Sequence, residues 1–234
     1  VGRETGQTIR ILENKNIYPV LGAPLLAYSI AAARQSGMID EIVVTSESPA
    51  YLEIARTWGA DRTVERPKEL ATSNISKTAS IAHAVAETEK QSGVRFDTVV
   101  DLDVTAPRRR CDEVKRALVL FDTRDSTALI SAVESKATPF SNMFFQDGDG
   151  CLETMIPAEL IQEHTGSARK CYALNASIYI WKREPLRLAL WARRERAPPS
   201  TSVSTVTSLS SVSSVWPGAC LWLRVLERIL PGKQ

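Results

Sequence analysis

The chain has 234 residues, of which 44% are hydrophobic, and this length suits one substantial domain. Its 29 basic residues nearly balance 27 acidic residues, so the net charge of +2 creates no large field for nucleic acid or a membrane surface. The four cysteines are far apart and form no Cys-x-x-Cys pair, which argues against a zinc site and a disulfide framework. No apolar run reaches the roughly 18 residues of a membrane span, and the first residues show no signal-peptide core. We therefore expect a cytoplasmic protein that binds neither nucleic acid nor membrane.

Helical and extended patterns alternate between residues 24 and 190. The helical segments are bounded by proline or glycine, and the strands are short runs rich in valine and isoleucine. Such alternation predicts an α/β fold with a mostly parallel sheet that helices cover on both faces, and ligands bind beyond the carboxyl ends of its strands. In chain order the pattern predicts a helix over 24–36, a strand over 41–46, helices over 49–58 and 76–91, a strand over 96–102, a helix over 112–122, a strand over 128–133, and a strand over 171–181 followed by a helix from near Glu184.

Residues 138–156 depart from this alternation. Two extended stretches flank the run Asp147-Gly148-Asp149-Gly150, which predicts a hairpin with a glycine-bearing turn. A two-stranded hairpin is marginally stable alone, so we expect this excursion to mediate a homodimer, with folding back onto its own domain as the alternative. The apolar side chains that need covering are Phe140, Met143, Phe144 and Phe145.

The composition changes abruptly after about Trp191. Residues 198–216 carry no charge and have no usable apolar period. We therefore expect residues 1–190 to form the folded domain and residues 191–234 to form a divergent, poorly ordered tail.

The segment 15–30 reads Lys-Asn-Ile-Tyr-Pro-Val-Leu-Gly-Ala-Pro-Leu-Leu-Ala-Tyr-Ser-Ile. It is similar to the K-N-I-x-P-L-x-G-K-P-L-I-A-Y-S-I segment of the acylneuraminate cytidylyltransferases, the CMP-sialic acid synthetase family. The resemblance covers roughly residues 9–190, and the ordered series of motifs is more specific than any one of them. Further matches follow in the family's order at 36–40, 66–72, 101–107 and 174–179.

The resemblance implies a Rossmann-like nucleotide-binding sheet with a hairpin that packs against a second subunit. It also implies an activity, the transfer of CMP from CTP to an acidic nine-carbon keto sugar. The anomeric hydroxyl of the sugar attacks the α-phosphorus, and pyrophosphate leaves. Because this chemistry depends on positioning and on neutralising negative charge, cationic side chains and magnesium ions are expected to matter most.

Four basic or amide side chains are candidates for the nucleotide site. The resemblance implies that Lys15 faces the phosphates and acts in catalysis, and that Asn16 helps to hold the nucleotide; standing alone, the pair would indicate a solvated turn. Arg66 matches an arginine that the family places against the nucleotide, although an isolated loop arginine is usually a solvated charge. Arg10 is the basic residue nearest to the family's first phosphate loop.

Asp101 and Asp103 flank Leu102 at the carboxyl end of a predicted buried strand, so both carboxylates point to one side of the sheet. Carboxylates at such a position suit magnesium, and we expect Asp103 to be a metal ligand and a catalytic residue and Asp101 to contact the substrate. The alternative is structural: the pair caps the next helix or pairs with an arginine in 108–110.

The segment 101–107 does not identify the sugar substrate. Many sialic acid enzymes have L-Q-P-T-S-P-L-R here, with glutamine where Asp103 stands, whereas a subgroup with less securely assigned sugars reads D-L-D-x-T-S-P. Sialic, legionaminic and related acids therefore all remain candidates. Arg169 is a candidate for the sugar carboxylate. Asn175 is expected to contact sugar or metal-bound water, or to bond to a neighbouring loop.

The sequence departs from the family at both ends. Where the family has a first strand ending in A-R-G-G-S-K, this chain has Thr-Gly-Gln-Thr-Ile-Arg at 5–10, and the bulky Ile9 hinders close approach of backbone to phosphate. The family's R-S-x-D-I-D-S-E segment, whose aspartates bind magnesium, has no counterpart, because no Asp follows Trp191. A catalytically impaired relative that keeps nucleotide binding and dimerisation is therefore the alternative to an active enzyme.

Overall fold

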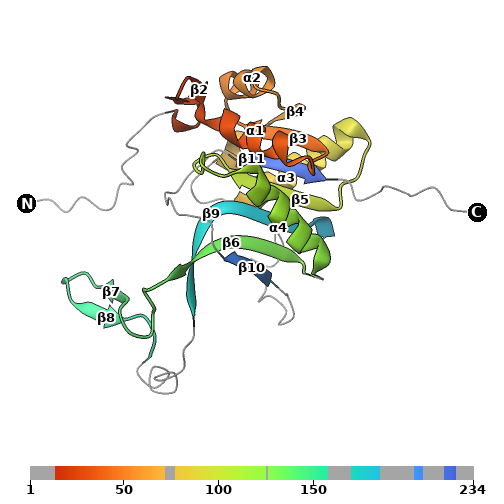
Figure 1. Cartoon of the computed structure of the whole chain (residues 1–234). Helices are drawn as coiled ribbons and strands as arrows, with labels where there is room; N and C mark the ends of the chain where they lie inside the picture. Colours follow the sequence, from red (N-terminus) through yellow and green to blue (C-terminus); the bar gives the residue numbers. More distant parts are fainter. Residues whose placement is uncertain are drawn as a thin grey trace, which may run out of the picture.

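The computed structural model describes residues 14–71, 77–124, 126–157 and 170–184, together with the backbone of residues 203–207 and 219–224. It has an α/β architecture in which helices cover a seven-stranded sheet (Figure 1). None of the helices in these ranges is long and apolar enough to cross a membrane. The helices are α1 (Leu25–Ser36), α2 (Pro49–Thr57), α3 (Lys77–Ser92) and α4 (Cys111–Thr123), with 3-10 turns η1 (Lys15–Ile17) and η2 (Lys68–Ala71).

The main sheet has the strand order β10-β6-β9-β5-β11-β3-β4. Two neighbouring pairs, β10–β6 and β3–β4, are parallel, whereas the other four pairs are antiparallel. The expectation of a mostly parallel sheet is therefore not confirmed: β9 and β11 run against the other five strands, and each lies between two of them. The strands are β3 (Glu41–Ser46), β4 (Arg62–Glu65), β5 (Thr98–Asp103), β6 (Ala128–Ser135), β9 (Cys171–Lys182), β10 (Val203–Thr207) and β11 (Ala219–Arg224).

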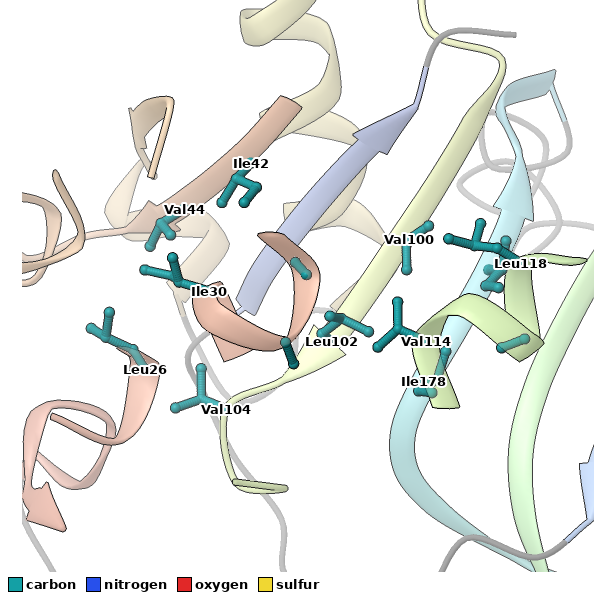
Figure 2. Packing of buried hydrophobic residues seen from close by; sticks show 14 of the residues in the cluster. Leu26, Ile30, Ile42, Val44, Val100, Leu102, Val104, Val114, Leu118 and Ile178 are labelled. Atoms are coloured by element: carbon teal, nitrogen blue, oxygen red, sulfur yellow. The ribbon is translucent and has the colours of Figure 1, made fainter. Parts of the chain in front are cut away.

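The side chains of β3 and β5 alternate between the two faces of the sheet, as a regular strand requires. On one face Ile42 and Leu102 belong to a core that α1 and α4 complete (Figure 2). On the other face Val43 and Val99 pack with Ile81 of α3. Both strands are thus buried on both sides, which explains why their sequences are continuous apolar runs rather than alternating ones.

The predicted helices and strands between residues 24 and 182 agree with the structure to within two residues at each boundary. Helix α1 illustrates the reason: Pro24 precedes it in extended conformation, and Gly37 ends it with a left-handed φ of 67° that favours glycine. Strand β4 was not expected, because its sequence Arg-Thr-Val-Glu is short and bounded by charges. The helix expected from near Glu184 lies almost entirely outside the described residues.

Two stretches of the tail differ from the poorly ordered segment expected over 191–234. Strand β10 pairs with β6, and β11 lies between β3 and β5, where it forms antiparallel ladders with both. The sequence of β10, Val-Ser-Thr-Val-Thr, is rich in β-branched residues, which suit a pleated strand even without an apolar period. The other residues of the tail lie outside the described part of the chain.

The hairpin excursion forms a separate two-stranded sheet of β7 (Phe144–Gln146) and β8 (Leu152–Thr154), which lies away from the main sheet (Figure 1). Its turn contains Gly150 with a φ of 89°. Phe145 and Leu152 are 55% and 67% exposed, so the hairpin does not fold its apolar side chains back onto the domain. A second short hairpin, β1 (Pro19–Val20) with β2 (Ala23–Pro24), precedes α1.

Candidate functional site

The carboxyl ends of β3, β4 and β5 meet at one edge of the sheet, because these three strands run in the same direction. In an open α/β sheet this edge is where ligands bind. Polar residues gather at these strand ends: Glu47 directly after β3, Arg66 directly after β4, and the pair Asp101 and Asp103 in the last three residues of β5.

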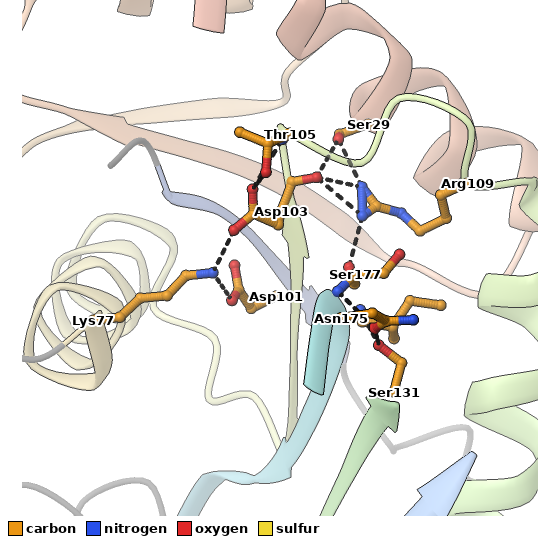
Figure 3. A network of polar contacts seen from close by, with 10 residues as sticks. Ser29, Lys77, Asp101, Asp103, Thr105, Arg109, Ser131, Asn175 and Ser177 are labelled. Carbon is orange, nitrogen blue, oxygen red and sulfur yellow. Dashed lines mark hydrogen bonds and ion pairs between the residues drawn. The ribbon is translucent and has the colours of Figure 1, made fainter. Parts of the chain in front are cut away.

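Asp101 and Asp103 share one face of the sheet with Val99, and this face is covered by α3. The sequence expectation that both carboxylates point to one side is met in the geometry of Figure 3, where Lys77 joins them. Nζ of Lys77 lies 2.6 Å from Oδ2 of Asp101 and 3.3 Å from Oδ2 of Asp103. The side chain of Asp101 is completely buried, whereas those of Asp103 and Lys77 are 20% and 38% exposed. The pair is therefore reachable from solvent on the side of Asp103 and Lys77.

The electrostatics of the cluster follow from this burial. Burial raises the pKa of Asp101, and the positive charge of Lys77 offsets only part of that effect. Burial also acts to raise the pKa of Asp103, but Lys77 and two hydrogen bonds from Thr105 outweigh it, so the pKa of Asp103 is lowered. For Lys77, burial acts to lower the pKa, and the two carboxylates outweigh it and raise the pKa. A charged Asp103 and a charged Lys77 are the stable state of the site.

Arg109 holds the loop that follows β5. Its buried guanidinium donates to the backbone carbonyl of Asp103 at 2.8 and 3.1 Å, to the carbonyl of Ser177 at 2.7 Å and to Oγ of Ser29 at 2.8 Å (Figure 3). The structural alternative, in which an arginine of 108–110 pairs with the carboxylates, is thus wrong for Arg109: it binds a backbone carbonyl, and Lys77 binds the carboxylates. Arg109 instead links α1, β5 and β9 through Ser29, the carbonyl of Asp103 and the carbonyl of Ser177.

Tyr179 of β9 completes the cluster. It lies opposite Asp101 in the β5–β9 ladder, and its ring centroid is 5.4 Å from Nζ of Lys77. The ring also stacks on Trp181, at 5.6 Å between centroids. An aromatic face next to a cation attracts it and excludes water from one side, so Tyr179 forms an apolar wall of the Lys77 site.

Asn175 lies on β9 at a point where the ladder with β6 changes register. Its Oδ1 accepts hydrogen bonds from Oγ of Ser131 at 2.6 Å and from the backbone nitrogen of Ser177 at 3.2 Å. The next residue, Ala176, has a left-handed φ of 55°, which costs a non-glycine residue about 1–2 kcal/mol. The side-chain oxygen of Asn175 therefore bonds to strands β6 and β9 rather than to a neighbouring loop, and its contact with sugar stays a prediction.

The residues predicted to bind the nucleotide lie on other parts of the chain than the acidic pair. Lys15 and Asn16 lie on η1, which packs against α1, and Asn16 is buried. Arg66 is 5% exposed and forms an ion pair with Glu47, so it is not a solvated charge. Arg10 and Arg169 lie outside the described residues.

The donor set for a metal ion at this edge is small. Within the described ranges, no three Asp, Glu, His or Cys side chains come close enough together to hold one. The pair Asp101 and Asp103 nevertheless fits magnesium, which is typically held by one or two carboxylates together with substrate phosphates. Oδ1 of Asp101 is buried and has no hydrogen-bond partner among the described residues, so it has a lone pair left for a cation.

Lys77 is the residue that sequence reasoning missed. One feature of the sequence could have indicated it. Lys77 is the first residue of α3, and the helix dipole disfavours a positive charge at a helix amino terminus. Such a lysine needs a nearby anion in the fold, and the carboxylates of β5 provide it.

Comparison with known proteins identifies the family. Residues 10–107 match the family model described as cytidylyltransferase. The chain is 31% identical over 180 residues to the post-translational flagellin modification protein B of Campylobacter coli, a match that covers 74% of this chain and 72% of that protein. It is also 31% identical over 175 residues to the CMP-N,N'-diacetyllegionaminic acid synthase of Campylobacter jejuni, covering 75% of this chain and 73% of that one.

The fold has a solved counterpart. The structure of CMP:2-keto-3-deoxy-manno-octonic acid synthetase complexed with CTP is similar with a TM-score of 0.60 and 14% identity, and the match covers 87% of both chains. At this identity the likeness concerns the fold alone. The ordered motifs, the matched family model and the two relatives agree, and the chain belongs to the acylneuraminate cytidylyltransferase family.

Proposed function

We propose that this protein transfers CMP from CTP to an acidic nine-carbon keto sugar of the N-acylneuraminate or a related nonulosonate type and releases pyrophosphate. The observation that carries the proposal is the placement of Asp101 and Asp103 at the sheet edge where Arg66 also lies, in a chain whose relatives include a CMP-diacetyllegionaminic acid synthase. This edge offers carboxylates for a cation and a buried guanidinium for an anion, the two charge types that a metal-bound nucleotide needs.

In this proposal the basic residues hold the nucleotide. Lys15 and Arg66 supply positive charge to the phosphates, and the amide of Asn16 contacts the cytosine. The new bond forms between the anomeric oxygen of the sugar and the α-phosphorus, while the bond from that phosphorus to the β-phosphate oxygen breaks. The hydroxyl proton passes from the attacking oxygen to solvent water, and the leaving pyrophosphate takes the electron pair of the broken bond.

Asp103, supported by Asp101, is the proposed holder of Mg²⁺. When bound, this ion neutralises charge on the phosphate oxygens and helps to position them. Arg109 keeps the backbone at Asp103 in place, and Thr105 orients the carboxylate through two hydrogen bonds of 2.7 and 2.9 Å. Asn175 and Arg169 are the proposed contacts of the sugar.

The decisive experiment is a pyrophosphate-release assay with CTP and a panel of keto sugars. N-acetylneuraminic, diacetyllegionaminic and pseudaminic acids would be compared with an eight-carbon keto sugar, and ATP, GTP and UTP would replace CTP in parallel. We expect release with CTP and at least one nine-carbon acid. Release only with another nucleotide, or only with the eight-carbon sugar, would reject the substrate assignment.

A second candidate is an impaired relative that binds nucleotide without efficient turnover. It is favoured by the sequence, because residues 5–10 lack the family's glycine-rich triphosphate loop and residues 192–234 contain no Asp. Losing one preorganised charge-stabilising group typically costs about 10²–10³ in rate, and losing a loop and a metal site costs more. Calorimetry with CTP separates the two candidates, since the impaired relative binds the nucleotide while the pyrophosphate assay stays silent.

We further propose that the protein is a homodimer formed through the β7–β8 hairpin. The support is the exposure of apolar side chains along the hairpin and the neighbouring part of β9, which water would otherwise contact. These side chains are Met143 at 38%, Phe144 at 48%, Phe145 at 55%, Leu152 at 67%, Tyr172 at 40% and Leu174 at 62%.

A further inference from the structure

We propose that the ammonium group of Lys77 is an internal cation that competes with a divalent metal ion for the carboxylates of Asp101 and Asp103. This inference deepens the proposed function and rests on its assignment of the metal to these two residues. It adds a residue that the sequence motifs did not single out, and it gives that residue a role opposite to that of a metal ligand.

The position of Lys77 is the first argument. Its Nζ lies within 3.3 Å of one oxygen from each carboxylate, so it occupies the point from which a single cation can touch both. The remaining oxygens differ: Oδ1 of Asp103 accepts two hydrogen bonds from Thr105, whereas Oδ1 of Asp101 is buried without a hydrogen-bond partner among the described residues. The two carboxylates thus surround one positive charge, and one buried oxygen of Asp101 can accept a further contact from a cation.

The charge balance is the second argument. When a cation holds both carboxylates in the ionised form, the ammonium of Lys77 gives the site a net charge of −1, and a divalent ion in its place gives zero. Holding both cations at once places like charges within a few ångströms of each other in a largely buried site, where Coulomb repulsion is strong because little water screens it. One cation therefore excludes the other.

Lys77 also has a route out of the site. Its side chain is 38% exposed, although the carboxylate of Asp101 that it contacts is fully buried, so the amino group can turn to solvent without unpacking the core. Arg109 differs from Lys77 in this respect, because four hydrogen bonds to carbonyl and hydroxyl oxygens hold its guanidinium in place. Of these two cations, both in the described part of the chain, Lys77 is the one placed to leave.

The test measures Mn²⁺ binding to the full-length protein by the electron paramagnetic resonance signal of the free ion, with and without CTP. The variants are Lys77→Met, which keeps the length and apolar stem of the side chain, and Lys90→Met as the matched control. Lys90 lies on the same helix, is 77% exposed and forms a long ion pair of 3.9 Å with Glu87. We expect Lys77→Met to bind Mn²⁺ at least about tenfold more tightly than the unmodified protein, since one unit charge a few ångströms away is removed, and Lys90→Met to bind it equally.

Asp103→Asn separates failure of this inference from failure of the metal assignment. If the unmodified protein binds Mn²⁺, Asp103→Asn loses it and Lys77→Met binds no more tightly, the metal site stands and the competition is refuted. If no protein in the series binds Mn²⁺ even with CTP, the metal assignment is refuted and the competition falls with it.

A measurement on the unmodified protein keeps the inference open to refutation if Lys77→Met does not fold. Amine acetylation, followed by mass spectrometry, reports how accessible each lysine is. Adding Mg²⁺ and CTP is expected to increase labelling of Lys77 several-fold relative to Lys90, because the amino group is released from the carboxylates. Labelling of Lys77 that stays constant or falls overturns the proposal.

Discussion

Replacing Arg109 with Met is expected to destabilise the fold strongly, although Arg109 is a charged residue in a loop. Arg109 is 7% exposed, and its guanidinium donates to three oxygens, the carbonyls of Asp103 and Ser177 and Oγ of Ser29. Methionine keeps most of the volume of the side chain and donates no hydrogen bond. The substitution therefore isolates the polar contribution from packing.

The magnitude follows from the acceptors that lose their donor. The carbonyl of Asp103 keeps two longer hydrogen bonds, from Oγ of Ser29 and the backbone nitrogen of Ala106, both at 3.3 Å. This leaves the carbonyl of Ser177 and Oγ of Ser29. A buried acceptor left without a donor costs about 1–3 kcal/mol, so Arg109→Met is expected to lower the free energy of unfolding by at least about 2 kcal/mol. With a urea m-value of about 2 kcal/mol per molar, the unfolding midpoint falls by about 1 M. Arg109→Lys retains the charge but offers a single donor group. Its free energy of unfolding is expected to lie between those of the unmodified protein and of Arg109→Met.

Urea unfolding followed by circular dichroism measures this effect, with Arg108→Met as the matched control because Arg108 is exposed. The control is expected to change stability by less than about 0.5 kcal/mol. A loss below about 1 kcal/mol for Arg109→Met would show that water satisfies these oxygens and that Arg109 does not tie the three elements together.

Three other measurements test separate parts of the molecule. Asp103→Asn is expected to remove the magnesium dependence of CTP binding in calorimetry while circular dichroism stays unchanged, and retained dependence would assign Asp103 to structure. Leu152→Glu is expected to convert a dimer into a monomer in sedimentation velocity, because it places a charge on the most exposed apolar side chain of the β7–β8 hairpin; a monomer before substitution would remove the dimer proposal. The bidentate pair of Glu89 with Arg183, at 2.8 and 2.9 Å, lowers the pKa of Glu89 below its ordinary value of 4.5 against the effect of burial. Its stabilisation is therefore complete above about pH 5 and is lost as the pH falls through the lowered pKa, so Glu89→Gln is expected to cost about 1–2 kcal/mol at pH 7 and progressively less as the pH falls through that pKa.

The local order of helices and strands could be predicted because each carries its own boundary signals. Gly37 ends α1 and the β-branched run of β3 marks a strand regardless of what surrounds them. Strand direction is different, because it depends on which segments become neighbours. The sequence of β9 does not state that it lies between β5 and β6, and β11 reaches its place between β3 and β5 from a tail far away in the chain.

The residues of the candidate site also fall into those that the sequence could place and those that it could not. Asp101 and Asp103 could be placed on one face because the period of a strand is two residues, and the structure has them there. Their partner could not be found, since Lys77 is separated from them by a whole helix and the fold alone brings α3 over β5. Arg66 and Glu47 illustrate the same limit: each follows its own strand, and only the parallel pairing of β3 with β4 joins them.

Under the proposed function, these internal pairs determine which ligand the site selects. The proposed cation site already contains the ammonium of Lys77, and Arg66, the proposed phosphate contact, already contacts the carboxylate of Glu47. A free metal ion must displace Lys77, and a free triphosphate must displace Glu47, so each ligand alone recovers only the difference between the new ion pair and the old one. In this proposal a metal-bound nucleotide brings both charges together, so that one binding event offers the acidic pair a cation and Arg66 an anion. The geometry therefore favours the complex over either component, because the complex supplies both replacement partners at once while the ammonium of Lys77 turns to solvent.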